Sequence, residues 1–349
     1  MKLFLTSILF ICFTNQIIAQ NLSNLSFGTD STFEVVSWNI EWFPKNGQTT
    51  ANYVQTILTN LQADVYALQE IDDTTLLKSV VANIPGYEYY FKSDWFAGLA
   101  YVYNSNKVQI NNQYEIYATS QYWNLFPRSP QVLEITFEGE DYIIINNHFK
   151  CCGDGALNQN DPNDEEYRRL TAATLLKQYI DSLFTNERVI VVGDLNDELT
   201  DSFINNVFQS FIDDTANYLF TDMLISQGNS ADWSYPTWPS HLDHILITNE
   251  LFTDFSKPNS IVECIRIDDY MSSWNTYDNN ISDHRPVGLK LEVDSVIISS
   301  IIETNTENKT LLRILDVLGR EVQPTSNTPL FYLYENGKVE KRIVIEENN

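Results

Sequence analysis

The stretch Val189-Ile190-Val191-Val192-Gly193-Asp194-Leu195-Asn196 decides the fold of this chain. Its four consecutive β-branched residues are typical of a strand that is buried on both faces of a sheet. Asp194 and Asn196 follow directly, and because side chains alternate along a strand, both point the same way off the end of the sheet. Such residues also form turns, but a divalent cation or a phosphate oxygen needs the same groups there. The stretch alone leaves a turn and a site equally open.

Five further segments likewise carry polar side chains within or directly next to apolar runs that are typical of strands. Ionised groups are costly to bury without partners, so their recurrence predicts a shared cluster. The segments are Trp38-Asn39-Ile40-Glu41, Leu68-Gln69-Glu70, Asn147-His148-Phe149-Lys150, Leu242-Asp243-His244-Ile245 and Ser282-Asp283-His284-Arg285-Pro286.

Taken in their order along the chain, the six segments resemble the motifs of the endonuclease/exonuclease/phosphatase superfamily. That superfamily includes pancreatic-type deoxyribonuclease, abasic-site endonucleases, neutral sphingomyelinases and inositol polyphosphate phosphatases. The resemblance runs from about Phe33 to about Val293. It implies a phosphodiesterase that depends on a divalent metal, with the fold of a four-layer α/β/β/α sandwich.

The resemblance also implies which residues bind metal and substrate. Glu70 is the expected first ligand of Mg²⁺, which takes one or two carboxylates in proteins and keeps several waters. Mn²⁺ is an expected substitute. Glu41 and Asp283 are expected to complete the metal site or to support it, and Asn39 to support it and face the substrate. Arg128, in Phe126-Pro127-Arg128-Ser129-Pro130, is expected to face a phosphate.

The remaining candidates are catalytic. His284 is the expected general base because the pKa of histidine lies near neutrality, and Asp243 would fix its tautomer. An alternative within the family assigns water activation to Asp194, and the sequence leaves both open. His148 is expected to donate to a non-bridging phosphate oxygen, and Asn196 to orient the attacking water or the phosphate.

Two histidines flank Asp243 without an assigned catalytic role. Strand alternation places His241 and His244 away from Asp243, so His241 is expected at the rim of the site and His244 in a structural position. Many members of the family have Arg where His241 stands, which leaves the substrate contacts at this position open.

The segment after His148 combines adjacent cysteines with a run of acids. Cys151, Cys152 and Cys264 are expected in an oxidising compartment, where three cysteines cannot all pair within the chain, so one stays free or bridges to another chain. A bridge of Cys151 or Cys152, to each other or to Cys264, would stiffen this segment; a metal site of the three thiols is the alternative. The acidic loop 153–166 could hold Ca²⁺, but its spacing favours a solvated lid.

Composition bounds the class of protein. A length of 349 residues allows one large domain and one small one, and 43% hydrophobic residues are typical of a packed core. The net charge of −26 argues against extensive contact with nucleic acid backbone, which needs Lys and Arg. It does not exclude an enzyme that works through bound metal.

Periodicity predicts an α/β (α+β) fold of two packed mixed sheets with helices outside. Predicted helices span 48–61, 74–84, 165–184 and 202–211, and predicted strands span 87–91, 99–104, 107–116, 131–137, 142–147, 242–248, 260–267 and 287–293.

The two ends of the chain suggest export. Residues 1–20 are typical of a signal peptide, and no other segment predicts a membrane span in the mature protein. Residues 21–294 form the expected catalytic domain and 295–309 a polar linker. Residues 310–349 form a small β module around Asp316-Val317-Leu318-Gly319-Arg320 and a terminal hairpin. This module resembles the type A sorting domain of the type IX secretion system, whose machinery would then be a partner.

The sequence therefore predicts a secreted or cell-surface phosphodiesterase, most consistent with an endonuclease acting on extracellular DNA or RNA. A lipid or small-molecule phosphodiesterase or phosphatase of the sphingomyelinase-like kind is the alternative. A non-catalytic surface-binding module is the third possibility, and it gives no reason for so many ionisable groups at strand ends.

Overall fold

The computed structural model describes residues 21–91, 98–293, 311–316, 319–324, 328–335 and 339–343. The chain divides into two compact units, Met1–Val296 and Ile297–Asn349. The predicted signal peptide and the predicted linker lie outside the described residues. No helix among the described residues has the length and apolar composition that crossing a membrane requires.

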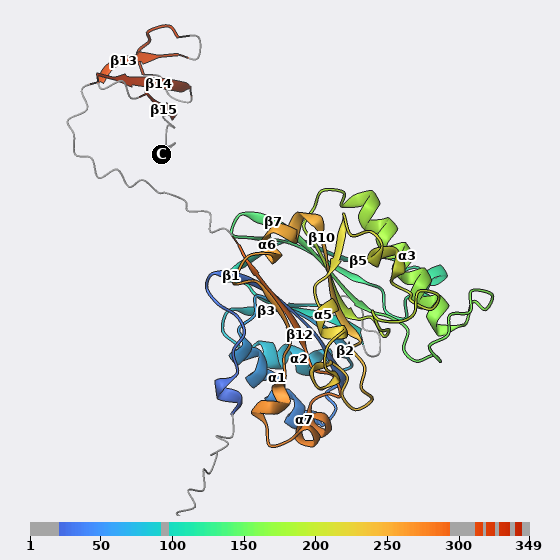
Figure 1. Cartoon of the computed structure of the whole chain (residues 1–349). Helices are drawn as coiled ribbons and strands as arrows, with labels where there is room; N and C mark the ends of the chain where they lie inside the picture. The colour runs from blue at the N-terminus through green and yellow to red at the C-terminus, as the bar shows by residue number, and fades with distance from the viewer. Residues whose placement is uncertain are drawn as a thin grey trace, which may run out of the picture. The chain divides into compact units, whose positions relative to one another are not determined.

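The first unit contains two six-stranded mixed sheets (Figure 1). The first has the order β11-β12-β1-β2-β4-β3, in which only β1 and β2 are parallel. The second has the order β5-β6-β7-β8-β10-β9, in which only β7 and β8 are parallel. The strands are β1 Thr32–Phe43, β2 Val65–Ile71, β3 Tyr87–Tyr90, β4 Gly98–Asn104, β5 Val108–Glu115, β6 Gln131–Phe137, β7 Glu140–His148, β8 Val189–Asp194, β9 Tyr218–Phe220, β10 Asp243–Thr248, β11 Ile261–Cys264 and β12 Val287–Glu292.

Alternation along the strands builds the layers. Val35 of β1 and Ile190 of β8 belong to the core between the two sheets, whereas Val36 and Val191 belong to the cores under the helices. Helices α1 Gly47–Leu61, α2 Thr74–Val81 and α7 Trp274–Asn280 pack on the first sheet, and α3 Glu165–Leu183 packs on the second. The predicted four-layer sandwich is confirmed.

Short helices occupy the connections of the first unit. They are α4 Gln209–Ile212, α5 Met223–Ser226 and α6 Phe252–Phe255, with the 3₁₀ turns η1 Leu22–Asn24, η2 Ser120–Tyr122, η3 Ser230–Asp232, η4 Asn249–Leu251 and η5 Ile267–Tyr270.

The helix predicted over 202–211 is wrong except for its last three residues. Residues 202–208 form turns, and only α4 is helical. The Asn206 side chain donates to the Leu199 carbonyl and accepts from the Phe208 amide, so it offers the backbone an alternative to helical hydrogen bonds. Phe203 and Ile204 are exposed, so the core holds the end of this stretch, at Val207, Phe208 and Phe211, but not its beginning.

The second unit is an antiparallel sheet of order β13-β14-β15, formed by Leu311–Leu315, Pro329–Tyr334 and Val339–Ile343. Its small core contains Leu330, Tyr332 and Tyr334. This confirms a separate C-terminal β module. The Asn336-Gly337 turn and part of the motif at 316–320 lie outside the described residues, but Asp316 accepts from the Arg320 backbone amide and from its Nε.

Candidate active site

One cavity of about 370 Å³ gathers most of the predicted site residues. Its walls come from the C-terminal ends of β1, β2, β7 and β8, together with the segments before β10 and β12. The lining residues are Glu41, Trp42, Glu70, His148, Cys151, Cys152, Asp194, Asn196, Tyr235, Trp238, Ser240, Leu242, Asp283 and His284. The shared cluster expected at the strand ends is therefore present in one place.

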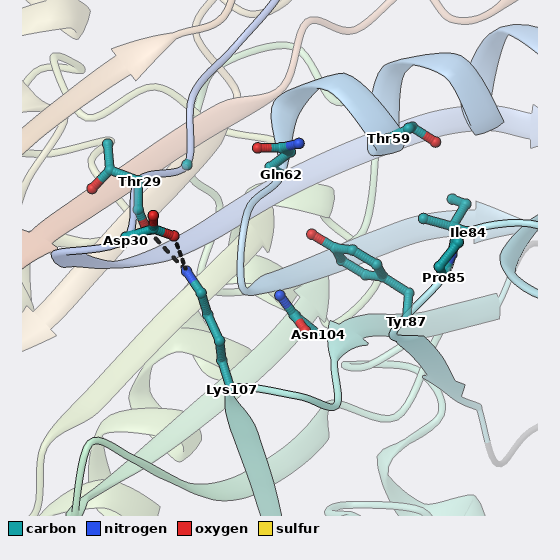
Figure 2. A pocket seen from close by; sticks show the side chains of 10 residues that line it. Thr29, Asp30, Thr59, Gln62, Ile84, Pro85, Tyr87, Asn104 and Lys107 are labelled. Carbon is teal, nitrogen blue, oxygen red and sulfur yellow. Dashed lines mark hydrogen bonds and ion pairs between the residues drawn. The ribbon is translucent and has the colours of Figure 1, made fainter.

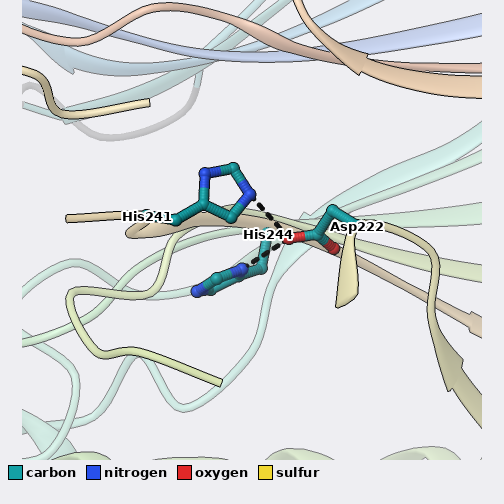
Figure 3. Close-up of side chains that lie close together, drawn as sticks. All are labelled: Asp222, His241 and His244. Atoms are coloured by element: carbon teal, nitrogen blue, oxygen red, sulfur yellow. Dashed lines mark hydrogen bonds and ion pairs between the residues drawn. The ribbon is translucent and has the colours of Figure 1, made fainter. Parts of the chain in front are cut away.

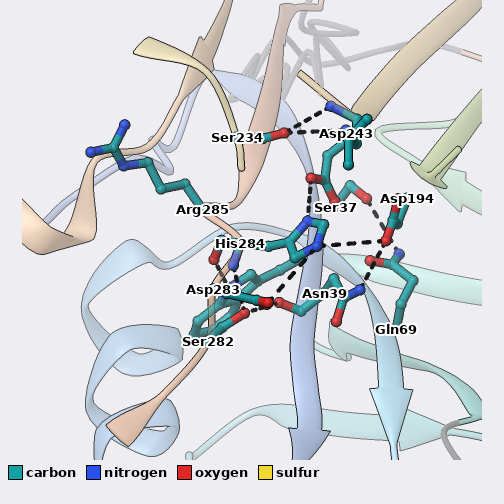
Figure 4. A network of polar contacts seen from close by, with 12 residues as sticks. Ser37, Asn39, Gln69, Asp194, Ser234, Asp243, Ser282, Asp283, His284 and Arg285 are labelled. Atoms are coloured by element: carbon teal, nitrogen blue, oxygen red, sulfur yellow. Dashed lines mark hydrogen bonds and ion pairs between the residues drawn. The ribbon is translucent and has the colours of Figure 1, made fainter. Parts of the chain in front are cut away.

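His284 and Asp243 form a hydrogen-bonded pair beneath this cavity (Figure 4). His284 Nδ1 lies 2.7 Å from Asp243 Oδ2, and Asp243 is fully buried. The backbone amide of His284 donates to Ser282 Oγ, which in turn donates to the Asn39 carbonyl. Because the backbone and the ring are both held, Nε2 of His284 is aimed at a fixed point.

Asp194 stands on the other side of the histidine ring. Its Oδ2 lies 3.8 Å from His284 Nε2 and 3.5 Å from His148 Nε2. Its Oδ1 accepts from the backbone amide of Asn196, whose side chain donates to the Phe149 carbonyl. Gly193 allows β7 to approach β8 closely beside Asp194, since it has φ +146° and a Cβ there would lie 2.0 Å from the Asn147 carbonyl oxygen.

Asn39 joins the two sheets at the site. Its Nδ2 donates to Asp194 Oδ2 at 2.9 Å and to Glu70 Oε1 at 3.1 Å, and its Oδ1 accepts from the Glu41 amide. Asn39 is almost fully buried. Its amide is thus engaged in holding two carboxylates, and it does not line the cavity.

The ends of β1 and β2 are irregular where they meet the cavity. Glu41, Trp42 and Glu70 all have positive φ, and the pairing register shifts beside them. A left-handed conformation costs non-glycine residues about 1 kcal/mol or more and is concentrated at functional sites. The irregularity turns Glu70 so that its Oε2 accepts from the Trp42 amide.

Glu41 and Asp283 form the exposed side of the carboxylate group. Glu41 Oε2 accepts from the Asp283 amide at 2.8 Å and from Lys45 Nζ, which also donates to Asp278. Glu41 therefore contacts Asp283 and a lysine, and both carboxylates retain partial access to the cavity.

The buried charges shift several pKa values. Burial lowers the pKa of His284, but the carboxylates of Asp243 and Asp194 outweigh burial and raise it to about 10. Burial raises the pKa of Asp194 to about 7, against the opposing charge of His284. Burial holds the pKa of His148 well below its usual range, and the charge of Arg128 lowers it further. His284 is thus cationic at neutral pH and His148 is neutral.

The donor set at the cavity fits a hard divalent cation. Burial raises the pKa of Glu41 to about 7, and repulsion from Asp283 adds to the effect despite the opposing Lys45. A cation at the Glu41 and Asp283 carboxylates would relieve that repulsion, and carboxylate oxygens are the protein ligands that Mg²⁺ prefers. Among the described residues, the three close donors at this cavity are Asp194, Asp243 and His284, and Glu70 forms no such group with Glu41 and Asp283. Arg128 acts on His148 through its charge and does not line the cavity.

A second group of possible metal ligands lies behind the cavity (Figure 3). Asp222 Oδ2 contacts His241 Nε2 at 3.0 Å and His244 Nδ1 at 2.6 Å, and all three residues are buried. His241 Nδ1 accepts from the Ser234 amide, and His244 Nε2 donates to the Asp197 carbonyl. Because Nδ1 of His241 accepts a hydrogen bond, the one proton of the neutral ring is on Nε2, which donates to Asp222. A metal bound at Nε2 would displace that proton and leave an imidazolate ring. Hydrogen bonds, and not a metal, therefore account for this group.

The rim position predicted for His241 is therefore wrong. β10 begins at Asp243, so strand alternation does not extend back to His241, and the residue turns inward to Asp222. His244 is fully buried in the same cluster. Sequence reasoning also missed Asp222 and Ser234, which hold this region from outside every recognised motif, and Trp42, whose position next to Glu41 was its only signal.

No disulfide links the three described cysteines. Among the described residues Cys151, Cys152 and Cys264 are all free thiols, with the first two exposed beside the cavity and Cys264 in the edge strand β11. No group of three donors close enough for one cation includes the described cysteines or the loop 153–166. The acids of the loop have structural contacts instead: Asp164 caps α3, and Glu166 accepts from the Gly155 amide.

Comparison with known proteins agrees with this geometry. A family model described as the Endonuclease/Exonuclease/phosphatase family matches residues 36–284. No curated protein matches the chain.

Solved structures share the fold at low sequence identity. D. rerio TDP2 with a single-strand DNA product is 14% identical, covering 76% of this chain and 100% of that one, with a TM-score of 0.56. The human Nocturnin catalytic domain with bound sulfate is 17% identical, covering 75% and 93%, with a TM-score of 0.53. A family protein from Bacteroides thetaiotaomicron is 15% identical, covering 75% and 98%, with a TM-score of 0.51.

Proposed function

The chain belongs to the endonuclease/exonuclease/phosphatase family, and from this premise we propose that it is a Mg²⁺-dependent phosphodiesterase that hydrolyses DNA or RNA outside the cell. The observation that carries the proposal is the convergence of the His284–Asp243 pair, Asp194 and Glu70 on one cavity. The similar structure of a TDP2 with a single-strand DNA product supports a nucleic acid substrate.

Glu70 and Asp283 would hold the metal, with Glu41 beside them. Bound there, Mg²⁺ would supply charge neutralisation to the phosphate that undergoes hydrolysis. Asn39 keeps the Glu70 carboxylate in place, and the strained backbone at Glu41 and Trp42 sets the shape of this wall. Mn²⁺ would satisfy the same oxygen donors.

Asp194 is the better acceptor for the proton of the attacking water. The pKa of His284 is raised to about 10, so its ring carries a proton at neutral pH, whereas that of Asp194 is about 7. His284, kept cationic by Asp243, would then donate from Nε2 to the phosphate or the leaving group. His148 is neutral and within reach of the same region, where it would donate to a non-bridging oxygen.

A side-by-side assay tests this function. Purified protein with Mg²⁺ is given supercoiled DNA, RNA, sphingomyelin vesicles and a phosphomonoester. We expect hydrolysis of a nucleic acid, its loss in chelator, and its loss in Glu70→Gln but not in the control Glu138→Gln, whose side chain is exposed and outside the cavity. Hydrolysis of the lipid alone would reject the nuclease proposal and leave the metal site standing.

A lipid phosphodiesterase is the second candidate, because one observation favours it. Trp238 is 77% exposed at the cavity. Exposed tryptophan also suits insertion into a lipid interface.

We further propose export through both ends of the chain. Residues 1–20 would be removed as a signal peptide, residues 21–294 would act as the catalytic domain, and the C-terminal sheet would serve as a sorting module for type IX secretion after the linker 295–309. The separate three-stranded unit supports this division.

A further inference from the structure

Two tryptophans line the catalytic cavity with much of their surface in solvent. Trp238 is 77% exposed and Trp42 is 45% exposed. Exposed large aromatic side chains at a polar cavity are typical of surfaces that contact a ligand. Neither residue has been given a part in the hydrolysis described above.

Trp238 is carried by a loop that is fixed at its base. The backbones of Tyr235 and Ser240 exchange two hydrogen bonds, of 3.0 and 3.1 Å. The amide of the preceding Ser234 donates to His241, whose ring is bound to the buried Asp222. The indole of Trp238 is therefore presented from a short closed loop that the buried cluster anchors.

Further contacts connect this loop to the catalytic pair. Ser234 Oγ accepts from the backbone amides of Leu242 and Asp243, and the ring of Tyr235 lies 4.8 Å from that of His284. Trp238 and His284 line the same cavity, so a ligand that contacts Trp238 there shares that cavity with the catalytic pair.

Trp42 is fixed from the opposite sheet. Its φ is +51°, and its amide donates to Glu70 Oε2. The amide of glycine or asparagine would make that hydrogen bond at the same positive φ, so the backbone contact does not require an indole. The second tryptophan is thus tied in position to the proposed metal ligand.

The charge of the catalytic unit favours recognition of a ligand through aromatic contacts. Residues 21–294 contain 14 Lys and Arg against 39 Asp and Glu, a balance of −25. No Lys or Arg is among the described residues that line the cavity. Affinity for a polyanion through its backbone would need such residues, and stacking of bases on aromatic rings does not.

We propose that Trp238 and Trp42 form a stacking surface for the base next to the scissile phosphate, so that the protein acts on unpaired nucleic acid strands. The proposal rests on the phosphodiesterase function proposed above. In a duplex the base is paired and stacked, and extruding it from the helix costs free energy. A base in a single strand is already unpaired, so this cost does not arise. Single-stranded substrates are therefore preferred over perfect duplexes.

The test uses the dinucleotide TpT and two analogues in which one thymidine is replaced by an abasic tetrahydrofuran residue. With Mg²⁺, Trp238→Ala should raise KM for TpT by about 5- to 150-fold, the range that one stacked base is worth, and change kcat little. On the analogue that lacks the stacked base, wild type and Trp238→Ala should have the same KM. Trp238→Phe should recover part of the affinity, because it restores a ring.

Trp123→Ala is the matched control. Trp123 is 50% exposed but does not line the cavity. Its replacement should leave KM unchanged on all three substrates. An equal rise in KM for TpT and for both analogues in Trp238→Ala would overturn the stacking surface, and so would an unchanged KM for TpT.

Equilibrium binding of TpT, followed by isothermal titration calorimetry, separates this proposal from the proposed function. Binding that Trp238→Ala weakens, without any hydrolysis, would reject the phosphodiesterase and retain the stacking surface. Hydrolysis of TpT, together with unaltered TpT binding in Trp238→Ala, would retain the phosphodiesterase and reject the stacking surface. Loss of binding to sphingomyelin-containing vesicles in Trp238→Ala, with TpT binding unchanged, would assign the indole to a lipid surface.

Discussion

A buried pair of carboxyl groups is predicted to make the free energy of unfolding depend on pH by a measurable amount. Glu34 and Asp64 are both fully buried at the end of β1 and β2 opposite the active site. Asp64 lies 3.4 Å from Lys107, which borders the cavity in Figure 2. Burial, followed by the hydrogen bond to Asp64 and its charge, raises the pKa of Glu34 to about 8. Glu34 therefore keeps its proton in the folded protein at neutral pH.

The sign of the stability effect follows from this order of pKa values. Below the ordinary pKa of 4.5 the side chain is protonated in both states, and its contribution to stability is fully present. Between 4.5 and about 8 the unfolded chain releases the proton and the folded protein retains it, so stability falls as pH rises. At about 1.4 kcal/mol per pH unit the loss has a ceiling of about 5 kcal/mol. Sharing of the charge with Asp64 and Lys107 should reduce the loss to about 2–3 kcal/mol.

Glu34→Gln removes the titration and keeps an N–H that can donate to Asp64. At pH 4 the variant and wild type should melt together, whereas at pH 9 the variant should melt about 5 °C higher, since about 2–3 kcal/mol raises the melting temperature of a domain of this size by that much. Glu138→Gln, at an exposed position, should show no such difference. The reasoning fails if Glu34→Gln is destabilised equally at both pH values.

Three further experiments concern the proposed chemistry and export. Chelation should abolish hydrolysis, and Glu70→Gln should lower kcat/KM at least about 100-fold while the variant remains folded by circular dichroism; a variant as fast as wild type would exclude Glu70 from the metal site. His284→Ala and Asp243→Asn should each lower kcat about 10²- to 10⁴-fold, and the double variant should lose little more than His284→Ala, whereas additive losses would show independent action. Mass spectrometry of the exported protein should place its N-terminus near Gln20 or Asn21, and deletion after residue 305 should stop export but spare hydrolysis; an inactive truncation would make the C-terminal unit part of the catalytic fold.

The sequence predicts the layers because burial determines alternation. Val189–Asp194 is buried along its whole length, as its β-branched run indicates, and the helices over 48–61 and 165–184 appear within a residue of their predicted ends. The motifs also locate Glu70, His148 and His284 at one cavity. Glu70 and His148 follow from the C-terminal ends of the parallel pairs β1/β2 and β7/β8, and His284 from the start of β12, which is antiparallel to β1.

The parts that the sequence does not predict depend on contacts between distant residues. Nothing in the residues around Asp222 indicates that its carboxylate binds His241, which is 19 positions away, and His244, which is 22 positions away. The left-handed backbone at Glu41 and Trp42 likewise could not be predicted, because neither residue is a glycine. Local patterns report burial and turns, and they do not report which polar groups meet across the core.

The active site is an interface between the two sheets, and this explains why its geometry depends on the core. Asn39 and His284 belong to segments of the first sheet, whereas their partners Asp194 and Asp243 belong to strands of the second. The apolar core between the sheets therefore sets the length of the two hydrogen bonds that define the site. Since a misplacement of about 1 Å can cost about 100-fold in rate, a change in that core acts on catalysis without touching a catalytic residue.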